Sequence, residues 1–215
     1  MEKNAAVLMA DLTGYTAMTD VHGGASAAML VNKYMELVEK ALKGDTQIIQ
    51  RVGDQVVLLA DNSEDIVNTA IELHSLTLGE HQTLSIHAGM HYGPVFVDKG
   101  DLFGSTINIA SRIMNKAEHG QILCSSAIVG KVNSDIYSFK SLGNFSFKNV
   151  MKEIMVYELI TDTKPEIYID PVCRMQIDPK RTEFIYQYKN HEYHFCSQHC
   201  LNLFKENQES FLVAD

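Results

Sequence analysis

The 215-residue sequence contains no apolar run that could cross a membrane and no excess of basic residues. Its longest uninterrupted apolar stretches, residues 5–10 and 56–60, are far shorter than the roughly 20 residues that a bilayer-spanning helix needs. A formal net charge of -9 argues against a general basic surface for bare nucleic acid. Nucleotides are compatible with this charge, because they need only a few placed cations and a metal ion.

The sequence also lacks a secretory signal, since its first residues, Met-Glu-Lys-Asn, have neither the basic nor the apolar part of one. We therefore expect a cytoplasmic protein with no membrane segment and no nucleic-acid partner. In that compartment the four cysteines should be reduced, which favours core, metal-binding or reactive roles over disulfides. A hydrophobic content of 46% with 21% charged residues is sufficient for a packed core.

Proline is scarce and unevenly distributed. Three of the four prolines, three of the four cysteines and eight of the eighteen Phe and Tyr residues lie after residue 164. The polar stretch that ends at Pro165 is typical of a short linker. We therefore predict a large domain over residues 1–162, a linker over 163–168 and a small domain over 169–215.

Hydrophobic periodicity predicts alternating strands and helices in the large domain. An apolar run at residues 4–12 indicates a buried strand, and helical spacing at 25–42 indicates a helix. A hairpin is expected where two strands meet at residues 53–54. The remaining expected elements are helices at 63–76, 105–116 and 126–132 and strands at 84–91, 121–124, 136–147 and 154–160. This order predicts an α+β fold, an antiparallel-rich sheet with its helices on one side.

Two aspartates are expected at one edge of this sheet. Asp11 ends the first strand and Asp54 lies in the hairpin, so both carboxylates can reach the same edge of a βαββ unit. Such carboxylates repel each other unless a cation lies between them, and their hard oxygen atoms suit Mg²⁺ or Mn²⁺ with a polyphosphate. The glycine that follows Asp11, in residues 12–16, lets backbone N–H groups approach phosphate oxygens. The alternative is that Asp11 is a cap and Asp54 an ordinary turn residue.

Three blocks of sequence resemble the signature blocks of the class III adenylate/guanylate cyclase catalytic domain. They are residues 7–16 (VLMADLTGYT), 51–54 (RVGD) and 104–112 (GSTINIASR). Further landmarks of that family are matched by residues 87–95, 120–126 and 147–149. The resemblance covers roughly residues 4–160, in order and at ordinary spacing. It implies a ferredoxin-like βαββαβ sandwich with an extra αβ unit and closing strands.

The resemblance implies catalytic roles for four side chains. Asp11 and Asp54 would hold two Mg²⁺ or Mn²⁺ ions, one at the ribose 3′-hydroxyl and one at the triphosphate. Asn108 and Arg112 are four residues apart on a predicted helix, hence on one face. They match the ribose-positioning Asn and the transition-state Arg of the family. Apart from the resemblance, such a pair is usually part of a solvated helix face.

The resemblance also implies the substrate contacts. The loop expected at the phosphates consists of Leu12, Thr13, Gly14, Tyr15 and Thr16. Lys148 matches a late Lys that touches the triphosphate, although Asn149 stands where Gly is common, and a surface Lys is the alternative. Asp101 matches the purine-contacting Asp of adenylate cyclases. Gln50 occupies the partner position, which is usually Lys in adenylate cyclases and Glu in guanylate cyclases. An amide both donates and accepts, so Gln50 discriminates weakly between adenine and guanine. We therefore expect ATP as substrate, because of Asp101, with side activity on GTP.

In this family the active site forms between two chains. The aspartates come from one subunit and the Asn and Arg from the other, and this chain carries both sets. The resemblance therefore implies a homodimer with two equivalent sites and an inactive monomer. The implied reaction converts ATP to 3′,5′-cyclic AMP and pyrophosphate.

The small C-terminal part resembles a YHS domain of the TRASH-like group over about 45 residues. The matching residues are 170–175 (DPVCRM), 193–197 (YHFCS) and Cys200. Arg174 replaces a commonly found Gly, which predicts an altered turn. We expect a small Cys-containing α+β domain here, at a size where a core alone gives marginal stability and a bound metal or docking onto the large domain would help.

Three cysteines of this part form a candidate site for a soft metal ion. Cys173, Cys196 and Cys200 suit Zn²⁺ or Cu⁺ when a His completes the set. The candidate fourth ligands are His194 and His199, with His191 a weaker one. The alternative is that the cysteines fill a small aromatic core, as we expect for Cys124 in its strand.

Three functions are consistent with these features. The first is an active cyclase whose tail senses metal or redox state. The second is a nucleotide-binding or metal-binding dimer that signals without efficient catalysis, favoured by Gln50 and Asn149. The third is a metal-handling protein whose large domain is a dimeric platform.

Overall fold

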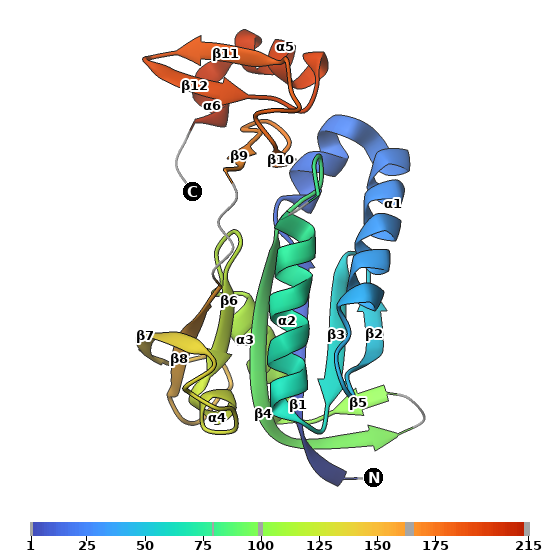
Figure 1. Ribbon diagram of the computed structural model, residues 1–215, viewed down its shortest axis with the longest axis vertical. Coiled ribbons are helices and arrows are strands. Elements are labelled where there is room, and N and C mark those ends of the chain that lie inside the picture. The colour runs from blue at the N-terminus through green and yellow to red at the C-terminus, as the bar shows by residue number, and fades with distance from the viewer. Residues whose placement is uncertain (1, 79, 99–100, 162–165, 213–215) are drawn as a thin grey trace.

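The computed structural model describes residues 2–78, 80–98, 101–161 and 166–212 (Figure 1). A large unit built on one sheet carries a small unit at one end, which we call the tail domain (residues 166–212). The predicted linker, residues 163–168, lies partly outside the described residues. Within the described part, every helix is too short or too polar to cross a bilayer.

The large unit is organised around an eight-stranded sheet in the order β2-β3-β1-β4-β6-β8-β7, with β5 paired to β4. Its strands are β1 (Glu2–Leu12), β2 (Gln47–Val52), β3 (Gln55–Ala60), β4 (Ile86–Asp98), β5 (Asp101–Phe103), β6 (Ile122–Ser125), β7 (Ser138–Phe145) and β8 (Ile154–Ile160). Only the β4–β6 pair is parallel among these described strands. The α+β sandwich expected from the sequence is confirmed.

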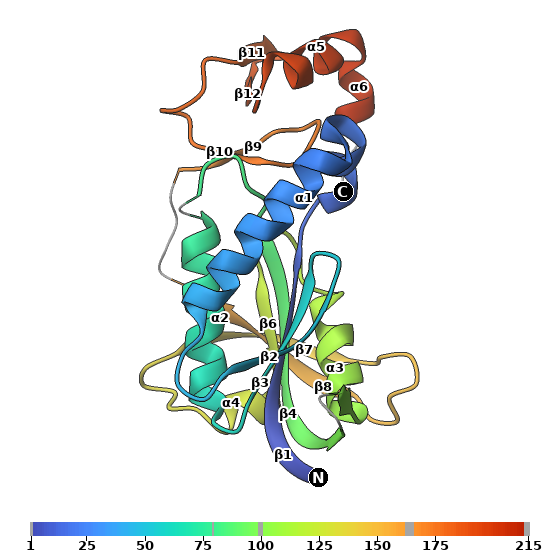
Figure 2. The same cartoon turned by 90° about the vertical axis from the view of Figure 1, so that its right-hand side faces the viewer.

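Helices cover both faces of this sheet (Figure 2). They are α1 (Tyr15–Ala41), α2 (Ser63–Leu78), α3 (Ser105–Met114) and α4 (Ser126–Val129). Alternate residues of β1 enter two cores: Leu8 packs with α1, α2 and α4, whereas Val7 packs with Ala110 and Met114 of α3. The expectation of helices on one side is wrong for α3. Because β1 is apolar on both faces, its sequence is that of a strand covered on both sides.

Helix α1 begins earlier than its periodicity predicts and bends at Gly23. The expected start at residue 25 marks only the part after the bend, because Gly23 adopts φ 79 and ψ 169 inside the helix. That conformation favours glycine. The segment from Tyr15 to His22 is therefore a separate helical arm that connects the end of β1 to the body of α1.

The tail domain contains two short β-ladders and two helices. Its elements are β9 (Tyr168–Ile169), β10 (Gln176–Ile177), β11 (Ile185–Tyr188), β12 (His191–His194), α5 (Gln198–Glu206) and α6 (Gln208–Phe211). Phe195 and Phe204 are fully buried at its centre, and Cys173, Cys196 and Cys200 belong to the same core.

The tail domain docks onto the loop between α2 and β4. The backbone of Gln176 donates to the carbonyl of Thr83 at 2.7 Å and accepts from the backbone N–H of Gln82 at 3.0 Å. The Gln82 side chain donates to the carbonyl of Cys196 at 2.8 Å, and Val21 of α1 packs against the tail core. The tail domain is therefore held to the large unit by backbone pairing as well as by apolar contact.

Candidate functional site

Asp11 and Asp54 meet at one edge of the sheet. Strands β1 and β3 pair directly, and Asp54 lies in the two-residue turn between Val52 and Gln55. The carboxyl group of Asp11 is close enough for its charge to act on Asp54 and raise the pKa of that carboxyl, and Asp11 accepts from the N–H of Leu12 at 3.1 Å. The structure thus brings together the two carboxylates that the sequence places at the same edge.

The negative charges of the two carboxylates repel each other. Burial and then the charge of Asp11 raise the pKa of Asp54 to about 6. Tyr34 of α1 is buried close to the same pair, and burial together with the charges of Asp11 and Asp54 raises the pKa of its phenol. Its hydroxyl has no hydrogen-bond partner among the described residues. Hard oxygen atoms with excess negative charge are the donor set that Mg²⁺ and Mn²⁺ prefer, so these residues fit a divalent ion.

The cost of this charge pair predicts that Asp54→Asn stabilises the metal-free protein. Above about pH 6 the folded state must keep Asp54 ionised against its raised pKa, whereas the unfolded carboxyl ionises near 3.8. The variant should therefore gain roughly 1 kcal/mol at pH 7.5 after allowance for solvent screening. The gain should fall to less than half near pH 4, where native Asp54 is protonated and the unfolded carboxyl is only about half ionised. Denaturant unfolding in EDTA at both pH values measures this.

The exposed Asp135→Asn is the matched control for that measurement and should change stability little at either pH. A loss of stability in Asp54→Asn at pH 7.5, or an equal gain at both pH values, would contradict the electrostatic account of the pair.

The loop after Asp11 turns sharply into α1. Gly14 has φ 89 and caps the helix, and its carbonyl accepts from the N–H of Met18 at 3.0 Å. Thr13 is held at the beginning of β4: its N–H donates to the carbonyl of Ser85, just before the strand, at 2.8 Å, and its hydroxyl lies 3.1 Å from Nδ1 of His87. Burial lowers the pKa of His87, with Asp54 acting in the opposite direction. Leu12 is buried at the end of β1, and Thr13 and Gly14, both partly exposed, form the turn. Tyr15 is partly exposed and Thr16 fully exposed, and both lie in the first turn of α1 rather than in the expected loop.

Asn108 and Arg112 lie on the exposed side of α3, as their spacing predicts. Helix α3 covers the sheet face opposite α1 and α2. Within the described residues, neither Asn108 nor Arg112 forms a hydrogen bond or ion pair with Asp11 or Asp54. A single chain therefore presents two separate sets of polar residues.

The remaining expected substrate contacts are distributed around the large unit. Gln50 is exposed on β2 opposite Val57, and Lys148 is exposed in the β7–β8 connection. Asn149 beside it has φ 65, a left-handed conformation that Asn tolerates better than most residues. Asn149 thus keeps the turn for which Gly is common. The side chain of Asp101, at the start of β5, lies outside the described residues.

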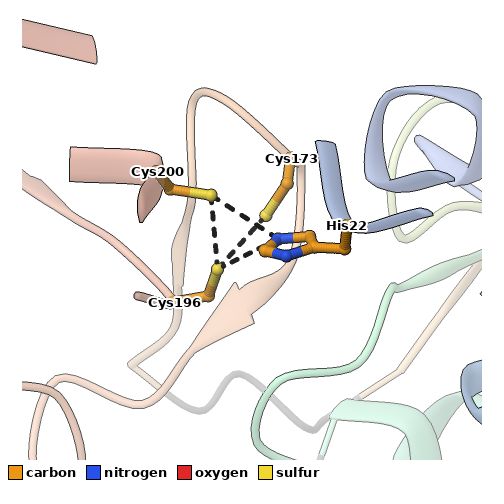
Figure 3. Close-up of side chains that lie close together, drawn as sticks. All are labelled: His22, Cys173, Cys196 and Cys200. Carbon is orange, nitrogen blue, oxygen red and sulfur yellow. Dashed lines mark hydrogen bonds between the residues drawn. The ribbon is translucent and has the colours of Figure 1, made fainter. Parts of the chain in front are cut away.

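A second group of side chains gathers where the tail domain meets α1 (Figure 3). The Sγ atoms of Cys173 and Cys196 are 3.5 Å apart, and those of Cys196 and Cys200 are 3.4 Å apart. Nε2 of His22 lies 3.4 Å from Sγ of Cys196 and 3.5 Å from that of Cys200. We call these four residues the interdomain cluster; their ligand atoms all lie within 4.8 Å of one another.

The histidines expected as fourth ligands are not part of the interdomain cluster. His194 is buried and its Nε2 lies 3.0 Å from a carboxylate oxygen of Glu192. His199 is exposed on α5, with its ring centroid 6.5 Å from that of His22, and His191 is exposed on β12. The three cysteines converge as predicted, but the imidazole beside them comes from the large domain.

Asp170 organises the two backbone segments that carry Cys173 and Cys196. One carboxylate oxygen accepts from the N–H groups of Val172 at 2.8 Å and Cys173 at 3.3 Å, and the other accepts from Cys196 at 2.8 Å. Burial and then the charge of Cys196 raise the pKa of Asp170 to about 6, so the carboxyl is mainly ionised at pH 7. Sulfur contacts from Cys173 and Cys200 lower the pKa of Cys196.

Sequence reasoning missed His22 and the role of Asp170. The signal available for His22 was its position just before two glycines, which interrupts the helical periodicity and ends a helical arm. Asp170 lies in the segment 170–175, in which the sequence singled out only Cys173. It is buried in a turn, where its carboxylate accepts hydrogen bonds from backbone N–H groups. Arg174 keeps φ 66, so the turn expected to change retains a left-handed residue.

Comparison with known proteins gives two family matches. Residues 1–161 match the adenylate and guanylate cyclase catalytic domain, and residues 168–214 match the YHS domain. Putative adenylate cyclase 3 of Rhizobium meliloti is 27% identical over 163 residues, covering 71% of this chain and 27% of that protein. The chain spans about a third of the length of the curated relatives it matches.

Solved structures show the same fold. The adenylyl cyclase CyaB of P. aeruginosa has a TM-score of 0.64 at 20% identity, covering 76% of this chain and 97% of that one. A dimeric guanylyl cyclase domain from the fungus Blastocladiella emersonii has a TM-score of 0.64 at 17% identity, with 75% and 98% covered. At these identities the likeness concerns the arrangement of the sheet and helices.

Proposed function

Because the chain belongs to the adenylate and guanylate cyclase catalytic domain family and carries a C-terminal YHS domain, we propose that it converts ATP to 3′,5′-cyclic AMP and pyrophosphate. The observation that carries this proposal is the pair of mutually repelling carboxylates, Asp11 and Asp54, beside the Gly14 loop. A relative named as an adenylate cyclase supports the choice of reaction.

The carboxylates Asp11 and Asp54 would hold two Mg²⁺ or Mn²⁺ ions. When bound, such ions lower the pKa of the ribose 3′-hydroxyl and neutralise the leaving pyrophosphate. The chain contributes the position of the carboxylates, which the β1–β3 pairing fixes at one edge. Gly14 takes the positive φ of 89 that turns the chain into α1, and the backbone N–H groups of this turn would be the donors to phosphate oxygens.

Asn108 and Arg112 would complete the site from a second subunit. On α3 they are exposed and separate from the carboxylates of their own chain, so a homodimer that apposes α3 of one chain to the Asp11–Asp54 edge of the other gives two equivalent sites. In that arrangement Asn108 orients the ribose and the Arg112 guanidinium meets the charge that develops at the α-phosphate. Lys148 adds positive charge for the triphosphate.

Base selection in the proposed site falls to Gln50 and Asp101. A carboxylate such as Asp101 accepts from the N6 amino group of adenine, which favours ATP. The amide of Gln50 both donates and accepts, so it discriminates weakly between adenine and guanine. We therefore propose ATP as the main substrate and GTP as a side substrate.

The interdomain cluster favours a regulatory role for the YHS domain. Three cysteines and a histidine lie beside the arm that follows the Gly14 loop, which suits a metal-binding module that reports to the cyclase domain. A dimer that binds nucleotide and signals without efficient catalysis is the second candidate, and the unusual Gln50 is the observation in its favour.

A direct assay distinguishes these candidates. Purified full chain is incubated with ATP or GTP and Mn²⁺ or Mg²⁺, and cyclic product is measured beside Asp54→Ala and the exposed control Asp135→Ala. We expect cyclic AMP from wild type and the control, less cyclic GMP, and background from Asp54→Ala. If wild type gives no more product than Asp54→Ala with either nucleotide and either metal, the chain is not a cyclase.

A further inference from the structure

We propose that the interdomain cluster is a single Zn²⁺ site to which the cyclase domain contributes one ligand, His22, so that the ion fastens the YHS domain to the arm of α1. The cluster draws one ligand from α1 and three from the tail domain (Figure 3). The site is therefore an interdomain one, unlike a site contained within the tail domain. Its metal binding does not depend on whether the chain is an active cyclase.

The spacing of the ligand atoms matches a tetrahedral ion. With Zn–S of about 2.3 Å and Zn–N of about 2.0 Å, neighbouring sulfur atoms lie roughly 3.8 Å apart and sulfur and nitrogen roughly 3.5 Å apart. The cluster has Sγ–Sγ distances of 3.4 and 3.5 Å and Sγ–Nε2 distances of 3.4 and 3.5 Å. These four distances are within about 0.4 Å of the tetrahedral values, and the remaining pairs of ligand atoms lie within 4.8 Å of each other.

The chemistry of the donor set also favours zinc. Three thiols and one imidazole form the Cys₃His set found at structural zinc sites. The four cysteines of the chain are free, and the Sγ–Sγ distances are far longer than the roughly 2.05 Å of a disulfide. Cys173, Cys196 and Cys200 are buried, as ligands of a closed site are, and His22 is half-buried at the domain boundary.

Outer hydrogen bonds hold the ligands in place. Asp170 ties the backbone at Cys173 to that at Cys196. Ser197 caps α5 by accepting from the N–H of Cys200 at 3.3 Å, which fixes the first turn that carries this cysteine. On the cyclase side, the left-handed Gly23 ends the arm directly after His22. The ligand-bearing segments are thus ordered by contacts that require no ion.

Arg174 connects the interdomain cluster to the Gly14 loop, the turn between β1 and α1. This residue follows Cys173, and its side chain packs so closely on Gly14 that a Cβ atom at position 14 would clash with the Cβ of Arg174. Thr13, Gly14, His87 and Arg174 line one cleft between the domains. The arm of α1 is therefore in contact with the tail domain at both of its ends. Arg174 packs on Gly14 just before the arm begins, and the interdomain cluster includes His22 at its end.

The first experiment measures metal binding by the full chain. We expect about one Zn²⁺ per purified chain by mass spectrometry of metals and, after Co²⁺ exchange, the visible absorption of a tetrahedral S₃N site. His22→Ala should weaken Zn²⁺ binding by about a hundredfold or more. His22→Cys should restore binding with a stronger sulfur-to-cobalt band. The matched control is His199→Ala, whose ring lies next to His22 outside the cluster; it should bind as wild type does.

Two results would overturn the proposal. One is a wild-type chain that binds neither Zn²⁺ nor Co²⁺. The other is a His22→Ala chain with unchanged affinity and an unchanged Co²⁺ spectrum, which would mean that the fourth ligand lies elsewhere. If His22→Ala does not fold, the His22→Cys spectrum still decides, because only a coordinating residue 22 alters the sulfur-to-cobalt band.

The second experiment measures whether the ion fastens the domains. Hydrogen exchange is followed at the N–H groups of Gln82 and Gln176, which bond across the domain boundary. In wild type, zinc removal should speed the exchange of these N–H groups by tenfold or more. In His22→Ala, zinc removal should change their exchange little. Equal protection with and without zinc would show that the ion does not hold the interface. Whether zinc removal also changes the rate of cyclic AMP formation is a separate question, because it rests on the proposed function. Neither metal binding nor hydrogen exchange depends on it.

Discussion

Mixing an Asp54→Ala chain with an Arg112→Ala chain should restore about a quarter of wild-type cyclase activity, although each variant alone should lose about a thousandfold or more. In a homodimer that shares its sites, a mixed dimer has one site with both substitutions and one site with neither. Half of the dimers in an equal mixture are mixed, and one of their two sites is intact. Product formation at increasing mixing ratios measures the restored fraction.

The physical reason is the separation of the two residue sets in one chain. Asp54 lies near Asp11 at the hairpin edge, whereas Arg112 is exposed on α3, on the sheet face opposite α1 and α2. Removing Asp54 withdraws a metal-holding carboxylate, and removing Arg112 withdraws the cation proposed to meet the α-phosphate.

The exposed Lys116→Ala, which lies just beyond the end of α3, is the matched control for lost surface charge and should keep nearly full activity. A mixture no more active than the two variants alone would show that each site draws on one chain. Restored activity that does not fall on dilution would indicate a dimer much tighter than the assay range.

Asp170→Ala should unfold the tail domain while leaving the sheet of the large unit intact. The substitution leaves three buried N–H groups, those of Val172, Cys173 and Cys196, without their acceptor. Hydrogen bonds to charged acceptors contribute roughly 1.5–3 kcal/mol each, and a core of this size rarely supplies more than about 3–5 kcal/mol. The loss is therefore comparable to the whole stability of the domain. Limited proteolysis should remove the tail and leave a resistant fragment of residues 1–161.

Asp178→Ala provides the comparison, because Asp178 accepts a similar turn hydrogen bond from Lys180 at the surface. It should leave the tail resistant to protease. Should Asp170→Ala resist protease as well as Asp178→Ala does, the carboxylate is not the support that its buried position indicates.

Local patterns were sufficient to predict the centre of the fold. The apolar run of β1 and the two-residue turn at Asp54 depend on neighbouring residues, and they place Asp11 and Asp54 at one edge. The side of the sheet that α3 covers depends on packing against alternate residues of β1. Because both faces of β1 are apolar, its pattern gives no indication of which helix takes which face.

The fourth member of the interdomain cluster could not be predicted for a different reason. The spacing of the cysteines indicates ligands only within their own domain, and there His194 and His199 are the nearest histidines in the sequence. His194 instead contacts Glu192, and His199 faces solvent. His22 reaches the cysteines only because Gly23 ends the arm and because the tail docks at the α2–β4 loop. The glycines at 23–24 mark the bend but not the direction in which His22 points, and the docking leaves no periodic signal in the sequence.

The long sequence separation within the interdomain cluster has a consequence for the order of assembly during synthesis. His22 and Cys196 are 174 residues apart, and at about 5–20 residues per second the ribosome needs roughly 10–30 seconds to make the stretch between them. The arm of α1 therefore leaves the ribosome long before its partners exist, and a chain truncated before Cys196 cannot form the cluster. The proposed Zn²⁺ crosslink would close a very long loop, which removes more chain entropy than a crosslink across a short loop does.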